Sequence, residues 1–162
     1  MFRNIVILAA FIIGLFSVAT AGAAEPKWMQ TKVREMVDRA RAETKHISIQ
    51  QLKQAIDDEA DVVILDVRTP KEYEVAHIPE SINAPRGLLE FSIWSLVPDQ
   101  QETIYVYCKT GARAALATKL LNDLGYTKAI AVDTGGAEWV KAGYPVQTSI
   151  SDETLILQPG PQ

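Results

Sequence analysis

Apolar and polar residues follow one another in blocks that predict short strands separated by helices. Residues 62–65 and 129–132 are unbroken apolar runs, and residues 103–107 form a third, largely β-branched and aromatic run. Runs of this kind are typical of central strands that are covered on both faces. Residues 46–47 and 81–83 predict two shorter strands. Strands that alternate with helices predict an α/β fold with a parallel sheet between layers of helices.

The segments between these strands carry helical patterns. Val33, Met36, Val37 and Ala40 have i, i+3, i+4, i+7 spacing, which predicts an amphipathic helix whose apolar stripe packs on the domain. Its alternative readings are a helix that binds a partner or a membrane surface. The predicted helices cover residues 31–42, 49–58, 70–75, 87–96, 112–124 and 137–142.

The predicted helix at residues 87–96 contains more large apolar residues than one buried stripe requires. It carries six of them in ten positions: Leu88, Leu89, Phe91, Ile93, Trp94 and Leu96. Because buried aromatic residues are common, we expect this helix to face the core. The alternative is that some of these side chains line the entrance to a binding site.

The two ends of the chain differ in composition from its middle. Arg3 precedes an apolar run at residues 5–18, and small residues follow at 19–24, which is the layout of a secretory signal peptide. We expect cleavage after Ala23 or Ala24, a periplasmic or secreted protein, and no stable membrane insertion afterwards; an uncleaved anchor is the alternative. Near the other end, residues 155–157 could add an edge strand and 159–162 are expected to be disordered.

These patterns divide the 162 residues into four predicted parts. They are a signal peptide at 1–24, an amphipathic helical extension at 25–45, one α/β domain at 46–147 and a partly disordered tail at 148–162. The net charge of −4 and the lack of a basic block give no support to a nucleic-acid partner. A single cysteine excludes an internal disulfide, and with two distant histidines it leaves no plausible zinc site. No metal and no cofactor are expected.

The one cysteine lies where a predicted strand meets a predicted helix. Cys108 ends the run at 103–107 and is followed by Lys109, Thr110, Gly111, Ala112 and Arg113, after which the Ala- and Leu-rich helix begins. Free amides at a helix N-terminus attract an anion, and Gly111 allows the tight turn that would direct them inward. The positive charges of Lys109 and Arg113 favour the thiolate. We therefore expect a nucleophilic sulfur in an amide cradle; the alternative is a buried, inert cysteine.

Polar residues also follow the other predicted strands. In a parallel α/β sheet, ligands bind at the carboxyl ends of the strands. Asp66 and Arg68, Asn83 to Arg86, and Asp133 to Gly136 would join Cys108 at that edge. Asp66, Arg68 and Arg86 are therefore candidate rim residues, although Asp66 and Arg68 could equally form a structural ion pair beneath the rim.

Three stretches of this sequence resemble single-domain rhodaneses. The segment 108–113, CKTGAR, matches the C-x-x-G-x-R active-site loop of that family, and 65–83 and 135–146 match its flanking motifs in the same order. The resemblance covers residues 47–146 and implies a five-stranded parallel sheet with helices on both faces. It also implies a sulfurtransferase that carries a persulfide on Cys108, with residues 109–113 holding the donor.

Under this resemblance the expected donor is a small sulfur-containing anion such as thiosulfate, or another persulfide, and the expected acceptor is cyanide or a thiol. The loop of four residues between Cys108 and Arg113 is one residue shorter than in phosphatases of the same fold, which disfavours phosphatase activity. The remaining alternative is a persulfide carrier or partner-binding module without turnover. His77 and Trp139 match family positions but are expected to be structural.

Overall fold

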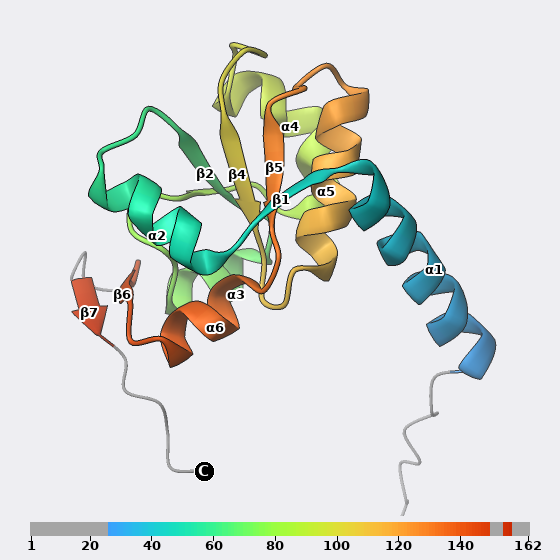
Figure 1. Cartoon of the computed structure of the whole chain (residues 1–162), viewed down its shortest axis with the longest axis horizontal. Helices are drawn as coiled ribbons and strands as arrows, with labels where there is room; N and C mark the ends of the chain where they lie inside the picture. The colour runs from blue at the N-terminus through green and yellow to red at the C-terminus, as the bar shows by residue number, and fades with distance from the viewer. Residues whose placement is uncertain (1–25, 150–153, 157–162) are drawn as a thin grey trace, which may run out of the picture.

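The computed structural model describes residues 26–149 and 154–156, so the predicted signal peptide and residues 159–162 lie outside the described part of the chain. The elements follow the chain in this order: α1 Lys27–Glu43, β1 Lys45–Ile47, α2 Ile49–Asp57, β2 Val63–Asp66, α3 Pro70–Val75, β3 Ile82–Asn83, the 3₁₀ turn η1 Arg86–Leu88, α4 Leu89–Leu96, β4 Ile104–Tyr107, α5 Ala112–Asp123, β5 Ala129–Val132, α6 Gly135–Lys141, β6 Pro145–Gln147 and β7 Thr154–Ile156. Figure 1 shows their arrangement.

The centre of the molecule is a five-stranded sheet in the order β1-β5-β4-β2-β3, in which every neighbouring pair is parallel. This confirms the predicted α/β class and the five-stranded parallel sheet. Because all strands run the same way, the ends of β2, β4 and β5 lie along one edge of the sheet. The loops that carry Asp66, Cys108 and Asp133 therefore meet there.

Successive residues of each strand face opposite layers, so the sheet separates two apolar clusters. Leu65 and Val106 point to one cluster, which α4 and α5 complete with Leu89, Ile93 and Leu121. Ile64 and Tyr107 point to the other cluster, which α2 and α6 complete with Leu52 and Trp139. The sheet is thus covered on both faces, as the unbroken apolar runs predict (Figure 1).

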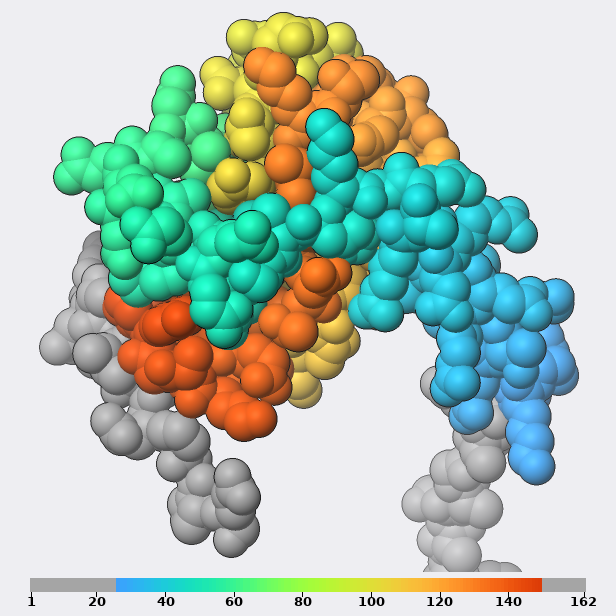
Figure 2. All heavy atoms as spheres, viewed as in Figure 1, coloured from blue at the N-terminus to red at the C-terminus, as the bar shows by residue number. Residues whose placement is uncertain are grey.

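Helix α1 belongs to neither layer but packs along the outside of α5. It begins at Lys27, directly after Pro26 and four residues before the predicted start. Of its predicted apolar stripe, only Val37 and Ala40 are buried, so the stripe packs on the domain only in part. Glu43 at its C-terminal end forms an ion pair with Lys119 of α5 at 3.4 Å. Figure 2 shows the N-terminal half of α1 standing clear of the rest of the molecule.

Two expectations from the sequence are corrected here. The prediction that the apolar side chains at residues 87–96 face the core holds only for Leu89 and Ile93; Leu88, Phe91 and Trp94 are 60%, 75% and 67% exposed. A short helix has only one face against the sheet, so the others point to solvent. Strand β7 does not extend the parallel sheet but pairs antiparallel with β6 in a separate two-stranded sheet. None of the helices that the structure describes is long and apolar enough to cross a bilayer.

Candidate active site

Cys108 lies directly after β4, at the sheet edge where the sequence predicts it. The residue is 1% exposed and belongs to the apolar cluster under α4 and α5. It therefore lies just beneath the surface rather than on it. Lys109 and Thr110, the next two residues, are exposed, and Gly111 and Ala112 lead into α5.

The main chain of this loop is held by the segment that follows β5. The amide of Gly136 donates a hydrogen bond to the Cys108 carbonyl oxygen at 2.7 Å, and the amide of Ala137 donates to the Lys109 carbonyl oxygen at 3.1 Å. A Cβ atom at Gly111, whose φ is +87°, would lie 1.8 Å from the Asp133 carbonyl oxygen. The two loops are packed backbone to backbone, and only glycine fits at this contact.

The loop amides themselves are free. In the described part of the chain, the main-chain N–H groups from Lys109 to Ala114 donate to no oxygen or nitrogen acceptor; the first amide of this region that does is Ala115, which donates to the Gly111 carbonyl oxygen at 2.9 Å. No side chain caps α5 either. Six amides without an acceptor, at the positive end of a helix dipole and directly after Cys108, leave donors available for an anion.

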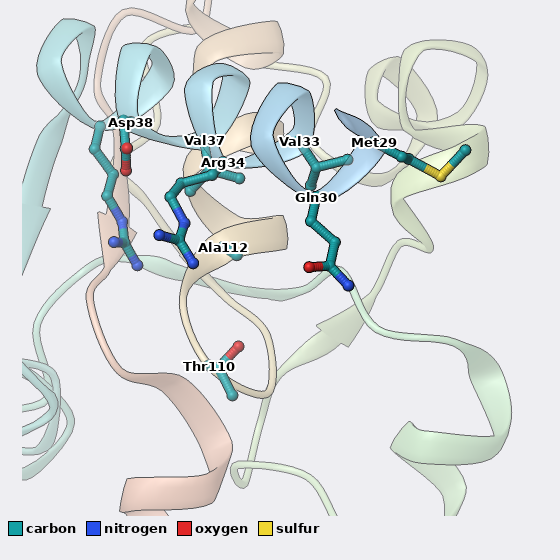
Figure 3. A pocket seen from close by; sticks show the side chains of 9 residues that line it. Met29, Gln30, Val33, Arg34, Val37, Asp38, Thr110 and Ala112 are labelled. Atoms are coloured by element: carbon teal, nitrogen blue, oxygen red, sulfur yellow. The ribbon is translucent and has the colours of Figure 1, made fainter. Parts of the chain in front are cut away.

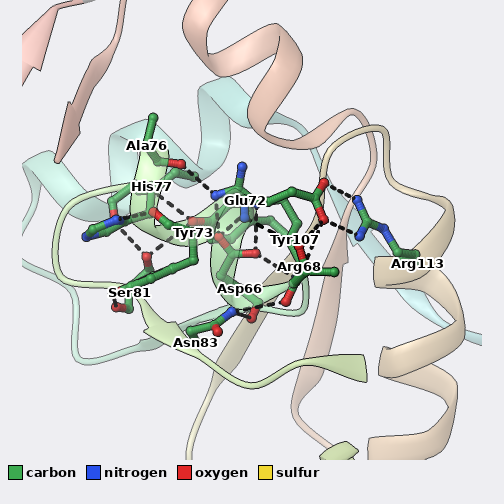
Figure 4. Close-up of polar contacts among 12 residues, drawn as sticks. Asp66, Arg68, Glu72, Tyr73, Ala76, His77, Ser81, Asn83, Tyr107 and Arg113 are labelled. Atoms are coloured by element: carbon green, nitrogen blue, oxygen red, sulfur yellow. Dashed lines mark hydrogen bonds and ion pairs between the residues drawn. The ribbon is translucent and has the colours of Figure 1, made fainter. Parts of the chain in front are cut away.

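Arg113 connects this loop to α3. Its guanidinium donates two hydrogen bonds to the Glu72 carboxylate, at 2.8 and 2.7 Å (Figure 4). Arg113 holds the pKa of Glu72 down at about 2, although burial opposes this, and Thr69 contributes hydrogen bonds in the same direction. The hydrogen bonds that Arg113 donates to Glu72 also raise the pKa of Arg113, and the neighbouring Cys108 sulfur adds to that increase. Arg113 therefore remains a cation that binds the Glu72 carboxylate and lies near the Cys108 sulfur.

A second ion pair lies beneath the site. The Asp66 side chain is completely buried and accepts hydrogen bonds from the Arg68 Nε at 2.9 Å to each oxygen, while Arg68 also donates to the Ala76 carbonyl oxygen at 2.7 Å. Burial alone lowers the pKa of Arg68, but the hydrogen bonds and charge of Asp66 outweigh it and raise the pKa overall. Asp66 is thus inside the fold rather than on its rim, and this pair fixes the end of β2.

The residue before the cysteine is equally fixed. The Tyr107 hydroxyl accepts a hydrogen bond from the Ile78 amide at 3.1 Å and lies 3.2 Å from the Ser81 hydroxyl, and burial raises the pKa of Tyr107. Arg68 lies over the Tyr107 ring at 5.5 Å. His77 is buried, stacks on Tyr73 at 3.8 Å and contacts the Tyr73 carbonyl oxygen, which agrees with the structural role predicted for it.

A shallow cleft of about 380 Å³ opens beside the loop. It is lined by residues of the loop, of the segment after β2, of α3 and of the start of α6: Arg68, Lys71, Glu72, Val75, Lys109, Gly136 and Ala137. Three of the seven are cationic and one is acidic, so the cleft suits a small anion. Arg86 is exposed and does not line it.

The structure brings most of the predicted site together and adds to it. Residues 108–113 form the loop after β4 and the first two residues of α5. Arg68 reaches the cleft, whereas Asp66 lies below it and Arg86 lies apart from it. Glu72 and Lys71 were not predicted as site residues. The sequence pattern that could have identified Glu72 is its capping box with Thr69, which fixes the Glu72 carboxylate at the N-terminus of α3. Nothing in the sequence indicates that Arg113 reaches it.

Comparison with known families agrees with this geometry. Residues 48–142 match the model of the rhodanese-like domain, which is more than half of the chain. The protein belongs to the rhodanese-like family. Helix α1 lies outside the matched region.

Several curated proteins of known name are similar to this chain. A sulfurtransferase of Allochromatium vinosum is 30% identical over 62% of this chain and 92% of its own length. The thiosulfate sulfurtransferase PspE of Escherichia coli is 36% identical over 39% of this chain, and the putative sulfur carrier protein YrkF of Bacillus subtilis is 36% identical over 57% of it. The matches span only 61% of PspE and 49% of YrkF.

Solved structures show the same fold. A polysulfide-sulfur transferase homodimer of Wolinella succinogenes is 26% identical, with a TM-score of 0.63 over 74% of this chain and 90% of that one. A Rhodopseudomonas palustris protein of unknown function, described as a possible tyrosine phosphatase, is 29% identical, with a TM-score of 0.67 over 71% of this chain and 93% of that one.

Proposed function

We propose that this protein is a sulfurtransferase that moves a sulfane sulfur from a thiosulfate-type donor to cyanide or a thiol through a persulfide on Cys108. The observation that carries the proposal is the set of six free amides, from Lys109 to Ala114, that follows this cysteine. Relatives named as sulfurtransferases agree with it.

In the first step, the Cys108 thiolate attacks the outer sulfur of thiosulfate. A bond forms between the two sulfurs, the bond between the outer sulfur and the sulfonate sulfur breaks, and its electron pair leaves with sulfite. The product is a Cys108 persulfide anion. The loop amides stabilise the negative charge on its terminal sulfur, so that no side-chain base is required.

In the second step, the acceptor takes the terminal sulfur. Cyanide forms a bond to it, the sulfur–sulfur bond breaks, and Cys108 leaves as a thiolate, which is ready for another donor. Because Cys108 is 1% exposed, the persulfide would be shielded from bulk water between the two steps. The residues that hold the loop, Glu72 and Arg113, keep the geometry the same in both half-reactions.

The test is the production of thiocyanate from thiosulfate and cyanide. Wild-type protein should turn over with parallel lines in double-reciprocal plots, which indicate a ping-pong mechanism. Cys108→Ser should be inactive while folding normally. Full activity in Cys108→Ser, or no thiocyanate from wild type, would refute the proposal.

A persulfide carrier is the second candidate, since the relative YrkF is named a putative sulfur carrier. It would gain one sulfur on Cys108 and release it to cyanide once, without repeated turnover. A phosphatase is disfavoured because only four residues separate Cys108 from Arg113. An aryl phosphate should therefore not be hydrolysed.

We also propose that the protein acts outside the cytoplasm, in the periplasm or after secretion. This rests on the composition of residues 1–24 alone, which lie outside the described part of the chain. N-terminal sequencing of the exported protein should begin at Ala24 or Glu25.

A further inference from the structure

A second and larger hollow lies on the other side of the active-site loop, between the loop and α1. It measures about 600 Å³, within the range of small-molecule sites. Its wall is almost entirely α1, and its floor is Thr110 and Ala112 of the loop. Figure 3 shows these two residues opposite the α1 side chains, and Figure 2 shows the open space beside α1.

This groove has an apolar part and a cationic part. Met29, Val33 and Val37 supply the apolar wall, and Arg34 and Arg41 supply two guanidinium groups. Figure 3 shows Arg34 extending from α1 toward the loop. Arg34 and Arg41 are seven residues apart on one helix, so they lie on the same face about 10 Å from each other.

The described residues around the groove do not neutralise its two arginine charges. Within residues 26–149 and 154–156, neither Arg34 nor Arg41 forms an ion pair with an acidic side chain. Asp38 also lines the groove, which leaves a net charge of about +1. The groove therefore favours an anion with an apolar body.

The groove is also close to the reactive sulfur. Thr110 is two residues beyond Cys108, so their Cα atoms lie within about 7.6 Å of each other. The C-terminal half of α1 is fixed to the domain by its buried Val37 and Ala40 and by the Glu43–Lys119 ion pair. A molecule bound along α1 can thus place one end beside the loop.

The geometry points to this groove as the binding site for an acceptor, namely an aliphatic thiol that carries a carboxylate. This inference rests on the proposed function. The thiol end would reach the persulfide, the chain would lie on Val33 and Met29, and the carboxylate would contact Arg34 or Arg41. The acceptor thiolate forms a bond to the terminal sulfur, the sulfur–sulfur bond breaks, and its electron pair returns to Cys108 as a thiolate. The transferred sulfur keeps the negative charge of the Cys108 persulfide anion, so the product is the persulfide anion of the acceptor.

The experiment measures sulfite release from thiosulfate with three acceptors: 6-mercaptohexanoate, its uncharged analogue 6-mercaptohexanol, and the shorter 3-mercaptopropionate. The carboxylate of the first compound and the hydroxyl group of the second both lie far from the thiol, so the intrinsic reactivities of these two thiols match. We expect wild-type kcat/KM for 6-mercaptohexanoate to exceed that for either of the others about fivefold.

The variant Arg34→Gln/Arg41→Gln should lose this preference for the carboxylate, and Val33→Asn should lower kcat/KM for both six-carbon thiols. Two controls lie on the same helix outside the groove: Arg39→Gln removes one positive charge where the double variant removes two, and Met36→Asn polarises a similarly exposed position (56% against 52% for Val33). Neither control should change the acceptor preference.

Thiocyanate production is measured in parallel, because cyanide needs no groove. Normal thiocyanate rates with equal kcat/KM for all three thiols, or equal effects of Arg39→Gln and the double variant, would overturn this inference and leave the proposed function intact. Absence of thiocyanate from wild type would instead refute the proposed function itself.

Discussion

At the scale of single residues, Cys108 combines burial with free donors. A buried thiol far from any charge is inert, but this one lies beside Arg113 and six unpaired amides. The sequence predicts the loop and its charges because Cys108, Gly111 and Arg113 are adjacent along the chain. It does not reveal Glu72 as the partner of Arg113, since 41 residues separate them and only the fold brings them together.

The Glu72–Arg113 ion pair gives a prediction for stability. Glu72→Gln keeps the capping box, since Gln also serves at that position, but it removes the ion pair. Because the pKa of Glu72 falls from 4.5 to about 2 on folding, its stabilisation is complete above pH 4.5 and is lost as the pH falls towards 2. The carboxylate is 32% exposed, so solvent screening limits the effect to about 1 kcal/mol at pH 7.

Urea denaturation of wild type and Glu72→Gln at pH 7, 4 and 3 measures this. The difference in the free energy of unfolding should shrink as the pH falls. Glu74→Gln removes the same charge from an exposed position of α3 and serves as the control. A difference that stays constant with pH would contradict the role assigned to this ion pair.

At the scale of elements, the sequence predicts a helix or strand correctly where adjacent residues form a clear pattern, such as a capping box or an unbroken apolar run. The capping box at Ser48 begins α2 as expected, and the unbroken apolar runs are the central strands. The faces of α4 could not be predicted, because six large apolar residues within the ten positions 87–96 do not indicate which of them meets the sheet. Strand β7 was placed at a sheet edge because no local pattern identified β6 as its partner.

The contact between the active-site loop and the segment after β5 gives the second prediction. Gly111→Ala would place alanine at a positive φ, which is unfavourable for a residue with a side chain. It would also place a Cβ atom 1.8 Å from the Asp133 carbonyl oxygen. Gly143 has a similar φ of +72° but no atom within 4 Å of its Cβ position, so Gly143→Ala is the matched control. We expect losses of unfolding free energy of about 3 kcal/mol for Gly111→Ala and about 1 kcal/mol for Gly143→Ala.

Urea denaturation and thiocyanate production distinguish the two glycine variants. Gly111→Ala should also lose most activity, because its amides can no longer keep their positions, whereas Gly143→Ala should keep its activity. Equal stabilities and equal activities of the two variants would show that the packing of the loop against Asp133 is not required.

At the scale of the whole molecule, the cleft beside the active-site loop has a charge opposite in sign to the net charge of the chain. The chain has a net charge of −4, yet Arg68, Lys71 and Lys109 line the cleft beside the active-site loop. A divalent anion is repelled by the molecule at long range and attracted only near the cleft. The net charge can be read from the sequence, but this local excess depends on α3 lying beside the loop.

This arrangement gives a prediction for donor binding. Lys109→Gln should raise the KM for thiosulfate about threefold at low ionic strength with little change in kcat. The effect should disappear near 1 M salt, where screening acts within about 3 Å. Lys128→Gln removes the same charge at the opposite edge of the sheet, before β5, and should leave KM unchanged. Equal effects of the two variants would contradict a local role for Lys109.

The central claim, that Cys108 accepts one sulfur and holds it in the amide cradle, is tested most directly by intact mass spectrometry. Wild-type protein treated with thiosulfate should gain the mass of one sulfur atom, located on Cys108 by peptide mapping. Cyanide should remove that mass and release one equivalent of thiocyanate. If wild type gains no mass, or if Cys108→Ser gains as much, the account is wrong.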